Sequence, residues 1–235
     1  MPDGGAAHFA EAVRCIRARA PRTLVEGLVG DFGGSLEGVA HVVRAGLHVC
    51  AHNLETVRRL TPHVRDPRAA YDQSLRVLQH AKSVQPGVYT KSSLMLGLGE
   101  QQDEVVEAMR DLRAVGVDFL TLGQYMRPTR NHMAPHAYVP PATFDALRDV
   151  ALQLGFRYVA AGPLVRSSYR AGELFIKSII RADAATDSVA VNVNVSAGAG
   201  ATANGDAICI GNATGTDTVT GTGIDTDIGT STSTA

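Results

Sequence analysis

The stretch that most restricts the fold of this chain is Thr90 to Glu100, with the sequence TKSSLMLGLGE. A short apolar segment is broken by Gly97 and Gly99 and passes into an acidic stretch that begins at Glu100. This order predicts a buried strand, a glycine turn and a helix, which together form one β/α unit. In barrels built from such units the loops after the strands carry the chemistry, and these glycines would let a ligand approach the backbone. A plain structural turn would use the same glycines, so both interpretations fit.

The same unit repeats from the start of the chain to about Arg181. Apolar residues at helical spacing alternate with short apolar runs, and Pro or Gly ends most of the helices. The predicted helices are 8–20, 36–43, 69–84, 101–115 and 144–154, and the predicted strands are 23–28, 47–51, 90–96, 118–122 and 156–161. This alternation is typical of a parallel α/β sheet with right-handed crossovers. Five strands are too few to close an eight-stranded barrel, so we expect an open sheet or a partial barrel.

The composition changes abruptly after Arg181. The chain has 22 Lys and Arg and 23 Asp and Glu, but the segment 182–235 contains six Asp and no basic residue, so 1–181 carries a formal charge of +5 and 182–235 one of −6. The tail consists mainly of Gly, Ala, Thr, Asn and Asp, a composition that does not offset the entropy of ordering. We therefore predict two regions, an ordered domain at 1–181 and a disordered low-complexity tail at 182–235. Alternating valines at 189–195 allow one strand within that tail.

Several classes of protein are disfavoured by what the sequence contains. No basic recognition helix or basic stretch interleaved with aromatics stands out, which argues against a nucleic-acid partner. No apolar run reaches the roughly 20 residues needed to span a bilayer. The three cysteines, Cys15, Cys50 and Cys209, lie far apart and have no metal-binding spacing, so we expect free thiols in a reducing compartment.

Polar residues follow four of the predicted strands, where parallel strands bring them to one edge of the sheet. These segments are His52 to Thr56, Lys91 to Glu100, Gly123 to Tyr125 and Arg166 to Arg170. Each also has a purely structural interpretation: a packed histidine, surface charges, or serines that cap a helix. Lys91 is harder to explain in this way, because a lysine in an apolar strand needs a charged partner or an open cavity.

Five strings in the chain closely resemble lipoyl synthases. They are HNLETV from His52, VRDPRAAYDQSLRVL from Val64, TKSSLMLGLGE from Thr90, LTLGQYMRPT from Leu120 and GFRYVAAGPLVRSSYRAGE from Gly155. The likeness covers about residues 2–181, and the RSSYRAGELF form is most similar to plant and algal members of the family. The resemblance implies an incomplete (β/α)6 radical S-adenosylmethionine barrel that lacks its first strands.

The resemblance also implies an activity, cofactors and site residues. Lipoyl synthases insert sulfur at C6 and C8 of a protein-bound octanoyl group, using S-adenosylmethionine and two 4Fe-4S clusters, one of which supplies the sulfurs. Ser168 matches the serine that ligates an iron of this auxiliary cluster in the family. The positions expected to approach the cofactor are Asn53, Glu55, Lys91, Gly97, Gly99, Glu100 and Gln124. The expected partner is an octanoylated lipoyl carrier domain, and the expected location is a mitochondrion or plastid.

The chain departs from the family in the residues that hold the clusters. Neither the CxxxxCxxxxxC motif nor the CxxxCxxC motif of lipoyl synthases is present, and Cys15 and Cys50 have the wrong spacing to replace them. One hypothesis is a partial lipoyl synthase sequence with a misassigned start and a translated non-coding tail. A second is a non-catalytic remnant that binds octanoylated carriers or the full-length enzyme. A third is an ordinary β/α enzyme that uses Lys91 as a base or Schiff-base residue.

The same resemblance predicts a weak point in the sheet. If the first strands of the barrel are missing, the strand at 23–28 has an unpaired edge. Such an edge is a template for aggregation.

Overall fold

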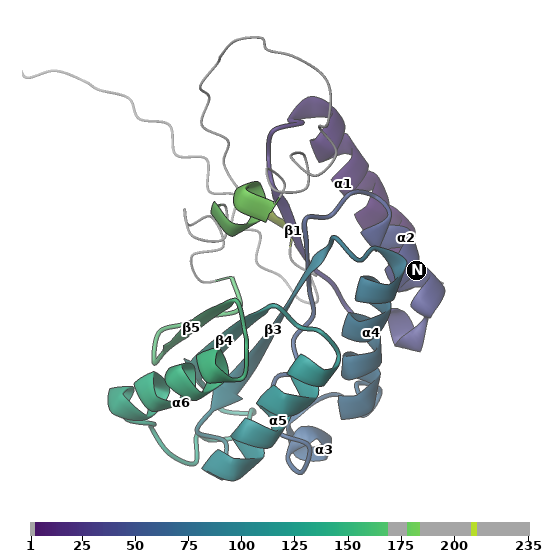
Figure 1. Cartoon of the computed structure of the whole chain (residues 1–235). Coiled ribbons are helices and arrows are strands. Elements are labelled where there is room, and N and C mark those ends of the chain that lie inside the picture. Colours follow the sequence, from purple (N-terminus) through teal and green to yellow (C-terminus); the bar gives the residue numbers. More distant parts are fainter. Residues whose placement is uncertain (1–2, 169–177, 184–207, 211–235) are drawn as a thin grey trace, which may run out of the picture.

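The computed structural model describes residues 3–168, 178–183 and 208–210. Along the chain, short strands alternate with helices, as the apolar periodicity predicts (Figure 1). The helices are α1 (Ala6–Arg19), α2 (Leu36–Val43), α3 (Thr61–Val64), α4 (Tyr71–Val84), α5 (Gln102–Ala114) and α6 (Pro141–Gln153), with a short 3-10 turn at Phe32–Gly34. The strands are β1 (Val25–Leu28), β2 (Val49–Ala51), β3 (Tyr89–Leu96), β4 (Phe119–Gln124), β5 (Tyr158–Gly162) and β6 (Ile208–Ile210).

All described strand pairs are parallel, in the order β5-β4-β3-β2-β1-β6. The strands that neighbour one another in the sequence, from β1 to β5, are also neighbours in the sheet, which is the arrangement that successive β/α units produce. The described strands form an open sheet, so the predicted α/β class and the unclosed barrel are confirmed. Because the strands are parallel, their carboxyl ends lie along one edge, and the loops that follow them gather there.

Local signals in the sequence fix most helix boundaries. The Ser35 side chain accepts a hydrogen bond from the backbone N–H of Gly38 at 3.2 Å and so caps α2. Gln101 and Glu104 form a reciprocal capping box at the start of α5. Gly116, with φ of 85°, follows α5 and takes the left-handed conformation that a helix stop requires.

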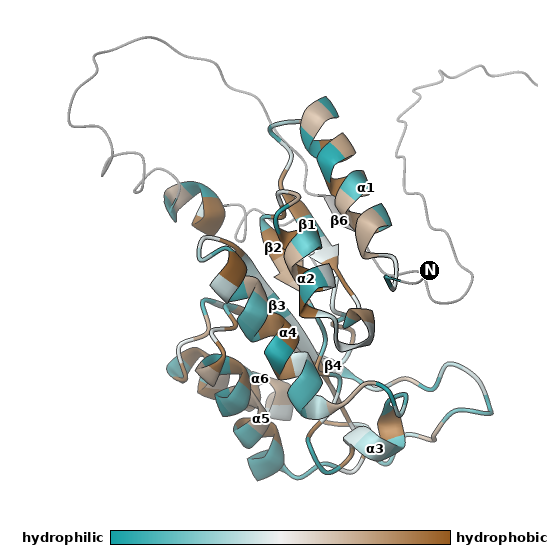
Figure 2. Ribbon diagram, turned by 90° about the vertical axis from the view of Figure 1, so that its right-hand side faces the viewer, coloured by the Kyte–Doolittle hydropathy of each residue, from teal (hydrophilic) through white to brown (hydrophobic). Residues whose placement is uncertain are grey.

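The helices cover one face of the sheet. Helices α1, α2, α4, α5 and α6 lie side by side there (Figure 1), and each carries a mixture of hydrophilic and hydrophobic residues (Figure 2). Two buried clusters fill this interface. One is built around Leu78, Met109 and Leu112, and the other around Val13 and Val43. Burial of these side chains is the main force that holds the helices on the sheet.

The opposite face of the sheet has its own small core near the amino ends of the strands. Tyr89 stacks on Phe119 with ring centroids 5.3 Å apart, and Ile180, from a helical segment at 178–183, packs against them. Asp183 accepts hydrogen bonds from the Tyr89 hydroxyl and from the Arg157 guanidinium. The segment 178–183 therefore covers this face of the sheet, here called the inner face, near the amino ends of the strands. Its contacts come from Ile180 and Asp183.

The edge of β1 differs from the expectation. The sequence predicts an unpaired edge there, but Ile208–Ile210 pairs with β1 as β6, with Glu26 opposite Cys209. The prediction of an open edge is wrong for these residues, because a short β-branched segment of the tail supplies backbone partners. The expected strand at 189–195 lies outside the described residues. None of the helices in the described part of the chain is long and apolar enough to cross a membrane.

A half-buried histidine gives the fold a predicted acid sensitivity. His48 Nδ1 accepts a hydrogen bond from the backbone N–H of Val25 at 2.9 Å, and its Nε2 lies 3.1 Å from an Arg17 guanidinium nitrogen. Burial, and secondarily the Arg17 charge, lower the pKa of His48 to about 4. The unfolded chain therefore binds a proton more readily than the folded chain between about pH 6.5 and pH 4. Stability contributed by His48 is complete above that window and is lost as the pH falls through it.

We expect the free energy of unfolding to fall by about 2 kcal/mol between pH 7 and pH 4.5 through this residue. The matched variant is His48→Asn, whose side-chain oxygen accepts from Val25 without titrating. Urea unfolding of both proteins at the two pH values measures the difference, and the loss in the variant should be smaller by the whole contribution of the histidine. Equal losses in the two proteins would contradict the assignment.

Candidate functional site

The largest described cavity, about 510 Å³, opens at the carboxyl ends of the strands. This is the edge at which β/α folds gather their functional loops, and the volume lies in the ~300–1,000 Å³ range of ligand pockets. Three groups of residues line the cavity: one from the segment after β2, one from β3 and β4, and one from the loops after β4 and β5. They are Asn53, Glu55, Ser93, Leu94, Met95, Gly123, Met126, Arg127, Pro128, Val165, Arg166 and Ser167.

Glu55 is held in this cavity by a strained backbone. Its φ of 70° is in the left-handed region, which residues with a side chain seldom adopt. Its N–H donates to the Ser93 carbonyl at 2.9 Å and its carbonyl accepts from the Met95 N–H at 2.8 Å, so the segment is fixed onto β3. Burial raises the pKa of the Glu55 carboxyl, and a hydrogen bond from Asn53 partly counteracts this. Strain retained by surrounding contacts is common in functional sites.

A second cavity of about 350 Å³ adjoins the first and shares Asn53 and Glu55 with it. His52 lies on its wall, with one ring nitrogen 2.9 Å from the Val29 carbonyl oxygen and the other 2.9 Å from the Ser74 hydroxyl. Burial lowers the pKa of His52, so the ring is neutral and both nitrogens are engaged. His52 is therefore a packed, hydrogen-bonded histidine, the structural alternative stated above.

The loop after β5 forms one wall of the first cavity. Gly123 on β4 has no room for a side chain, because a Cβ there would overlap the Val165 carbonyl oxygen. The Arg166 guanidinium donates to the Gln124 carbonyl at 3.0 Å and ties the same loop to β4. Ser167 lines the cavity, whereas Ser168 is the next residue outward and is exposed. Gly123 and Arg166 thus fix the position of the two serines.

The Gly97 to Glu100 turn makes contacts within the protein instead of lining this cavity. The two carboxylate oxygens of Glu100 accept the backbone N–H groups of Gly97 and Leu98, at 2.6 and 2.8 Å. Gly97 has φ of 93°, and a Cβ there would overlap the Ala137 carbonyl oxygen. These contacts account for the glycine through close packing of the loop that precedes α6.

Gln124 and Gly99 belong to the same packed region. The Gln124 side chain donates to the Ala137 carbonyl at 3.0 Å and accepts from the Val139 N–H at 2.9 Å. Gly99, with φ of 105°, packs against His136, since a Cβ on Gly99 would lie 3.6 Å from Cγ of the imidazole ring. The described contacts of both residues therefore hold the loop between β4 and α6.

Lys91 lies deeper on the inner face of the sheet and is 1% exposed. Its ammonium forms an ion pair of 2.8 Å with Glu26 of β1, which is 5% exposed. The sequence argument required a partner for Lys91 but did not find Glu26, although a carboxylate inside the apolar strand VEGL gave the same signal. Lys91 is almost fully buried and its side-chain nitrogen is engaged by Glu26, so this geometry does not favour the Schiff-base hypothesis.

The second Glu26 oxygen has no hydrogen-bond partner among the described residues. The same is true of the Thr121 hydroxyl. The inner face therefore holds two buried oxygens, one on Glu26 and one on Thr121, that could each accept a hydrogen bond.

The described residues do not fit an iron–sulfur cluster. Among them, no group of three His, Cys, Asp or Glu side chains lies close enough together to hold a metal ion. Cys15 is exposed on α1, while Cys50 is fully buried in the core beneath the helices, where burial raises the pKa of its thiol to about 12. Cluster ligands are thiolates, and these two thiols are separated and differently placed.

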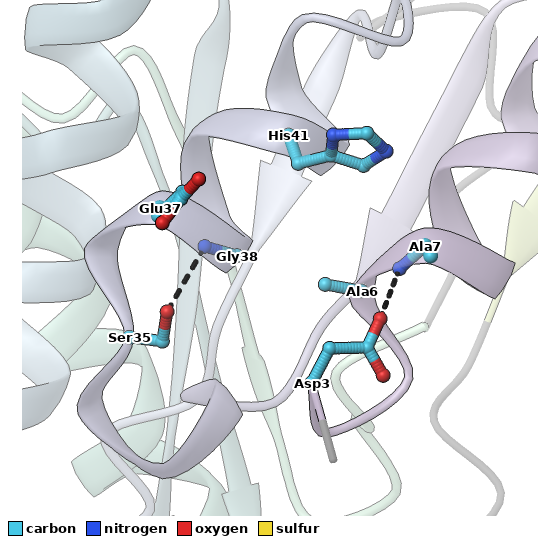
Figure 3. A pocket seen from close by; sticks show the side chains of 7 residues that line it. All are labelled: Asp3, Ala6, Ala7, Ser35, Glu37, Gly38 and His41. Atoms are coloured by element: carbon cyan, nitrogen blue, oxygen red, sulfur yellow. Dashed lines mark hydrogen bonds between the residues drawn. The ribbon is translucent and has the colours of Figure 1, made fainter. Parts of the chain in front are cut away.

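A third cavity, of about 300 Å³, lies between the starts of α1 and α2 (Figure 3). Two of its polar side chains, Asp3 and Ser35, already have structural partners. Asp3 accepts from the Ala7 N–H at 2.8 Å and Ser35 accepts from the Gly38 N–H at 3.2 Å (Figure 3). Because both side chains cap helices, this groove is a weaker candidate than the cavity at the carboxyl ends of the strands.

Comparison with known proteins identifies relatives of this chain, although no family model matches it. It is 60% identical over 181 residues to the lipoyl synthase of Thermus thermophilus, and the match covers 77% of this chain and 56% of that protein. It is 58% identical to lipoyl synthase 1, chloroplastic, of Oryza sativa subsp. indica, covering 49% of that protein. It is also 58% identical to the mitochondrial lipoyl synthase of Emericella nidulans, covering 44%. The chain spans about half the length of the curated relatives it matches.

Among solved structures, methylornithine synthase (PylB) superimposes with a TM-score of 0.50. The match covers 77% of this chain and 62% of that structure, at 14% sequence identity. At this identity the likeness concerns the fold alone. It agrees with the open parallel sheet described above.

Proposed function

We propose, on the premise that this chain is a homologue of lipoyl synthases over most of its length, that it serves the sulfur-insertion reaction of that family. The reaction places sulfur at C6 and C8 of a protein-bound octanoyl group. The observation that carries the proposal is the 60% identity over 181 residues, together with a cavity whose polar walls belong to the strings that resemble the family.

The lining of the cavity is chemically suited to an acyl chain. Met95, Met126 and Val165 offer apolar surface, and removal of an alkyl chain from water onto such surface is favourable. The polar groups come from different elements: Asn53 and Glu55 from the segment after β2, and the arginines and Ser167 from the loops after β4 and β5. We assign Asn53 and Glu55 to the S-adenosylmethionine side, because Glu55 is fixed between the two cavities.

The assignment of the other site residues also rests on the family resemblance. When bound, S-adenosylmethionine and the clusters supply the radical and the sulfur atoms. Ser168 is the proposed iron ligand of the auxiliary cluster, but one hydroxyl does not hold a cluster, and the described residues supply no thiolate set beside it. In this proposal the contribution of Gly97, Gly99, Glu100 and Gln124 is to hold the loop between β4 and α6, and that of Lys91 is its ion pair with Glu26. We infer an octanoylated lipoyl carrier domain as partner and a mitochondrion or plastid as the location.

A chimera tests this proposal directly. The part of the Thermus thermophilus lipoyl synthase that precedes the matched segment would be joined to residues 1–183 of this chain, and the clusters would be reconstituted anaerobically. We expect the chimera to convert an octanoyl-lysine carrier into a lipoyl carrier, within about tenfold of the rate of the Thermus enzyme, because the two proteins share 60% of their residues over the matched segment. Mass spectrometry of the carrier measures the two added sulfurs.

Two controls define the outcome. The Thermus portion alone should be inactive, and the chain alone should bind no cluster because its cysteines lack the required spacing. A folded chimera that carries both clusters and cleaves S-adenosylmethionine but adds no sulfur would overturn the proposal.

The scattered cysteines favour a second candidate, a non-catalytic protein that binds octanoylated carriers or a full-length lipoyl synthase. This function needs the cavity but no cluster. It is distinguished by pull-down of the octanoylated carrier with the chain alone, in the absence of iron and sulfide. Retention of the octanoylated but not the unmodified carrier would favour this candidate.

A further inference from the structure

A short helical segment, residues 178–183, covers the inner face of the sheet at the amino ends of the strands. Ile180 is the buried residue of this segment, with 8% of its surface exposed. It packs in one cluster with Val49, Tyr89 and Phe119, which come from the three adjacent strands β2, β3 and β4. We call residues 178–183 the amino-end cover.

Asp183 fastens the amino-end cover to two strands at once. Its carboxylate accepts two hydrogen bonds from the Arg157 guanidinium, at 2.6 and 3.0 Å, and a third from the Tyr89 hydroxyl. Tyr89 is the first residue of β3, and Arg157 directly precedes β5. The hydrogen bonds from Arg157, and then from Tyr89, lower the pKa of Asp183 to about 2, so the carboxylate is charged at neutral pH. Forked bonds of this kind fix an orientation as well as adding attraction.

The attachment of the amino-end cover is nevertheless weaker than that of the helices on the other face. The side chains of Asp183 and Arg157 are each 40% exposed, and ion pairs that remain open to water contribute little to stability. The apolar contact depends mainly on Ile180, with Ile179 partly buried beside it. Segments with few buried apolar contacts open locally at a lower free energy than the core does. The cover can therefore separate from the sheet while the sheet stays folded.

The buried Lys91–Glu26 pair lies next to the contacts of this cover. Glu26, Val49 and Tyr89 are partners in register on β1, β2 and β3, so their side chains form one row across the inner face. Lys91 follows Tyr89 by two residues and projects from the same face. The second Glu26 oxygen has no partner among the described residues, and a water that entered from the amino end would donate a hydrogen bond to it.

We propose that the amino-end cover is a latch, which Asp183 keeps closed through Arg157 and Tyr89. Its release opens an entrance to the inner face at the end of the sheet opposite the large cavity. Through this entrance water reaches the Lys91–Glu26 pair, whose attraction is strongest while water is excluded. The inference rests on the described fold and stands whether or not the proposed function holds.

The experiment measures access from the amino end with a thiol introduced into the full chain. Val49→Cys places that thiol in the row between Glu26 and Tyr89, whereas the adjacent native Cys50 belongs to the core beneath the helices. Alkylation of each thiol by iodoacetamide is followed by mass spectrometry. Adding Asp183→Asn, which keeps the shape of the side chain but removes its charge, should speed alkylation of the introduced thiol about tenfold or more. Alkylation of Cys50 should change less than about twofold, because the helices stay in place.

Two further variants show whether the latch itself is responsible. Arg157→Gln should reproduce the effect of Asp183→Asn, and the two together should add nothing further, since both remove the same contact. The matched control is Asp145→Asn, which breaks the exposed 2.7 Å pair with Arg148 on α6. It should change neither alkylation rate by more than about twofold.

Hydrogen exchange of the full chain without the introduced thiol gives an independent readout if Val49→Cys does not fold. We expect the peptide that contains residues 178–183 to exchange about tenfold faster in Asp183→Asn, with the peptide from α5 unchanged. Three results would overturn the latch. They are equal alkylation and exchange in the parent and Asp183→Asn, an equal rise at Cys50, which indicates general loosening, and complete exchange of 178–183 at the earliest time in the parent, which indicates a cover that is never closed.

Discussion

Replacing Lys91 with methionine should destabilise the chain by about 3–5 kcal/mol, the cost of leaving one partner of a buried ion pair alone. Lys91 and Glu26 are 1% and 5% exposed, and their charged atoms are 2.8 Å apart. Without the ammonium, the Glu26 carboxylate would lie on the inner face with neither oxygen compensated, since its second oxygen already lacks a partner among the described residues. Denaturant unfolding followed by circular dichroism measures the loss.

A double variant keeps this prediction testable if the single variant does not fold. Lys91→Met combined with Glu26→Leu removes both charges, and replacement of a whole buried pair by apolar residues is often neutral or stabilising. We therefore expect the double variant to recover most of the loss. The control is Arg148→Ala, which breaks an exposed pair with Asp145 and should cost less than about 1 kcal/mol. Equal destabilisation by the single and double variants would show that packing, not charge pairing, dominates at Lys91.

The sequence predicts the secondary structure and the need of Lys91 for a charged partner, but it does not predict which residue that partner is. The helix predicted at 36–43 has those bounds in the structure, and most other elements agree within a few residues, because apolar periodicity and glycine stops are local signals. The need of Lys91 for a partner is a local signal of the same kind. The partner, Glu26, lies 65 residues earlier and meets Lys91 across the sheet, a contact that only the assembled strands define.

The residues of the candidate site likewise fall into two groups: those whose position follows from the strands they end, and those whose contacts depend on distant parts of the chain. Asn53, Glu55 and Ser167 line the cavity because they follow strands, and the strand-end rule predicts their edge of the sheet. The Gly97 turn also follows a strand, but it is covered by Ala137, which belongs to the later loop between β4 and α6. Its contacts within the protein depend on the path of that loop, which carries no regular periodicity. The pairing of Ile208–Ile210 with β1 is likewise a long-range event within a tail whose composition predicts disorder.

A second large effect is expected at Gly123, where space and not conformational freedom demands glycine. A Cβ at this position would overlap the carbonyl oxygen of Val165, so Gly123→Ala must displace the loop that carries Ser167 and Ser168. Overpacking of this kind costs about 1–3 kcal/mol, and a misplacement of about 1 Å in a catalytic site costs on the order of 100-fold in rate. We expect the chimera to lose sulfur insertion about 100-fold while most of it stays folded.

Gly162→Ala is the matched control for this prediction. Gly162 lies on the adjacent strand β5, and a Cβ there would sit 3.5 Å from a Val165 methyl carbon, an ordinary contact. Its activity should stay within about threefold of the parent, because the loop need not move. Sulfur insertion, melting temperature and S-adenosylmethionine cleavage would be measured on both variants. If Gly123→Ala retained full sulfur insertion, the loop after β5 would not be the element that positions the serines, and the assignment of Ser168 would lose its structural basis.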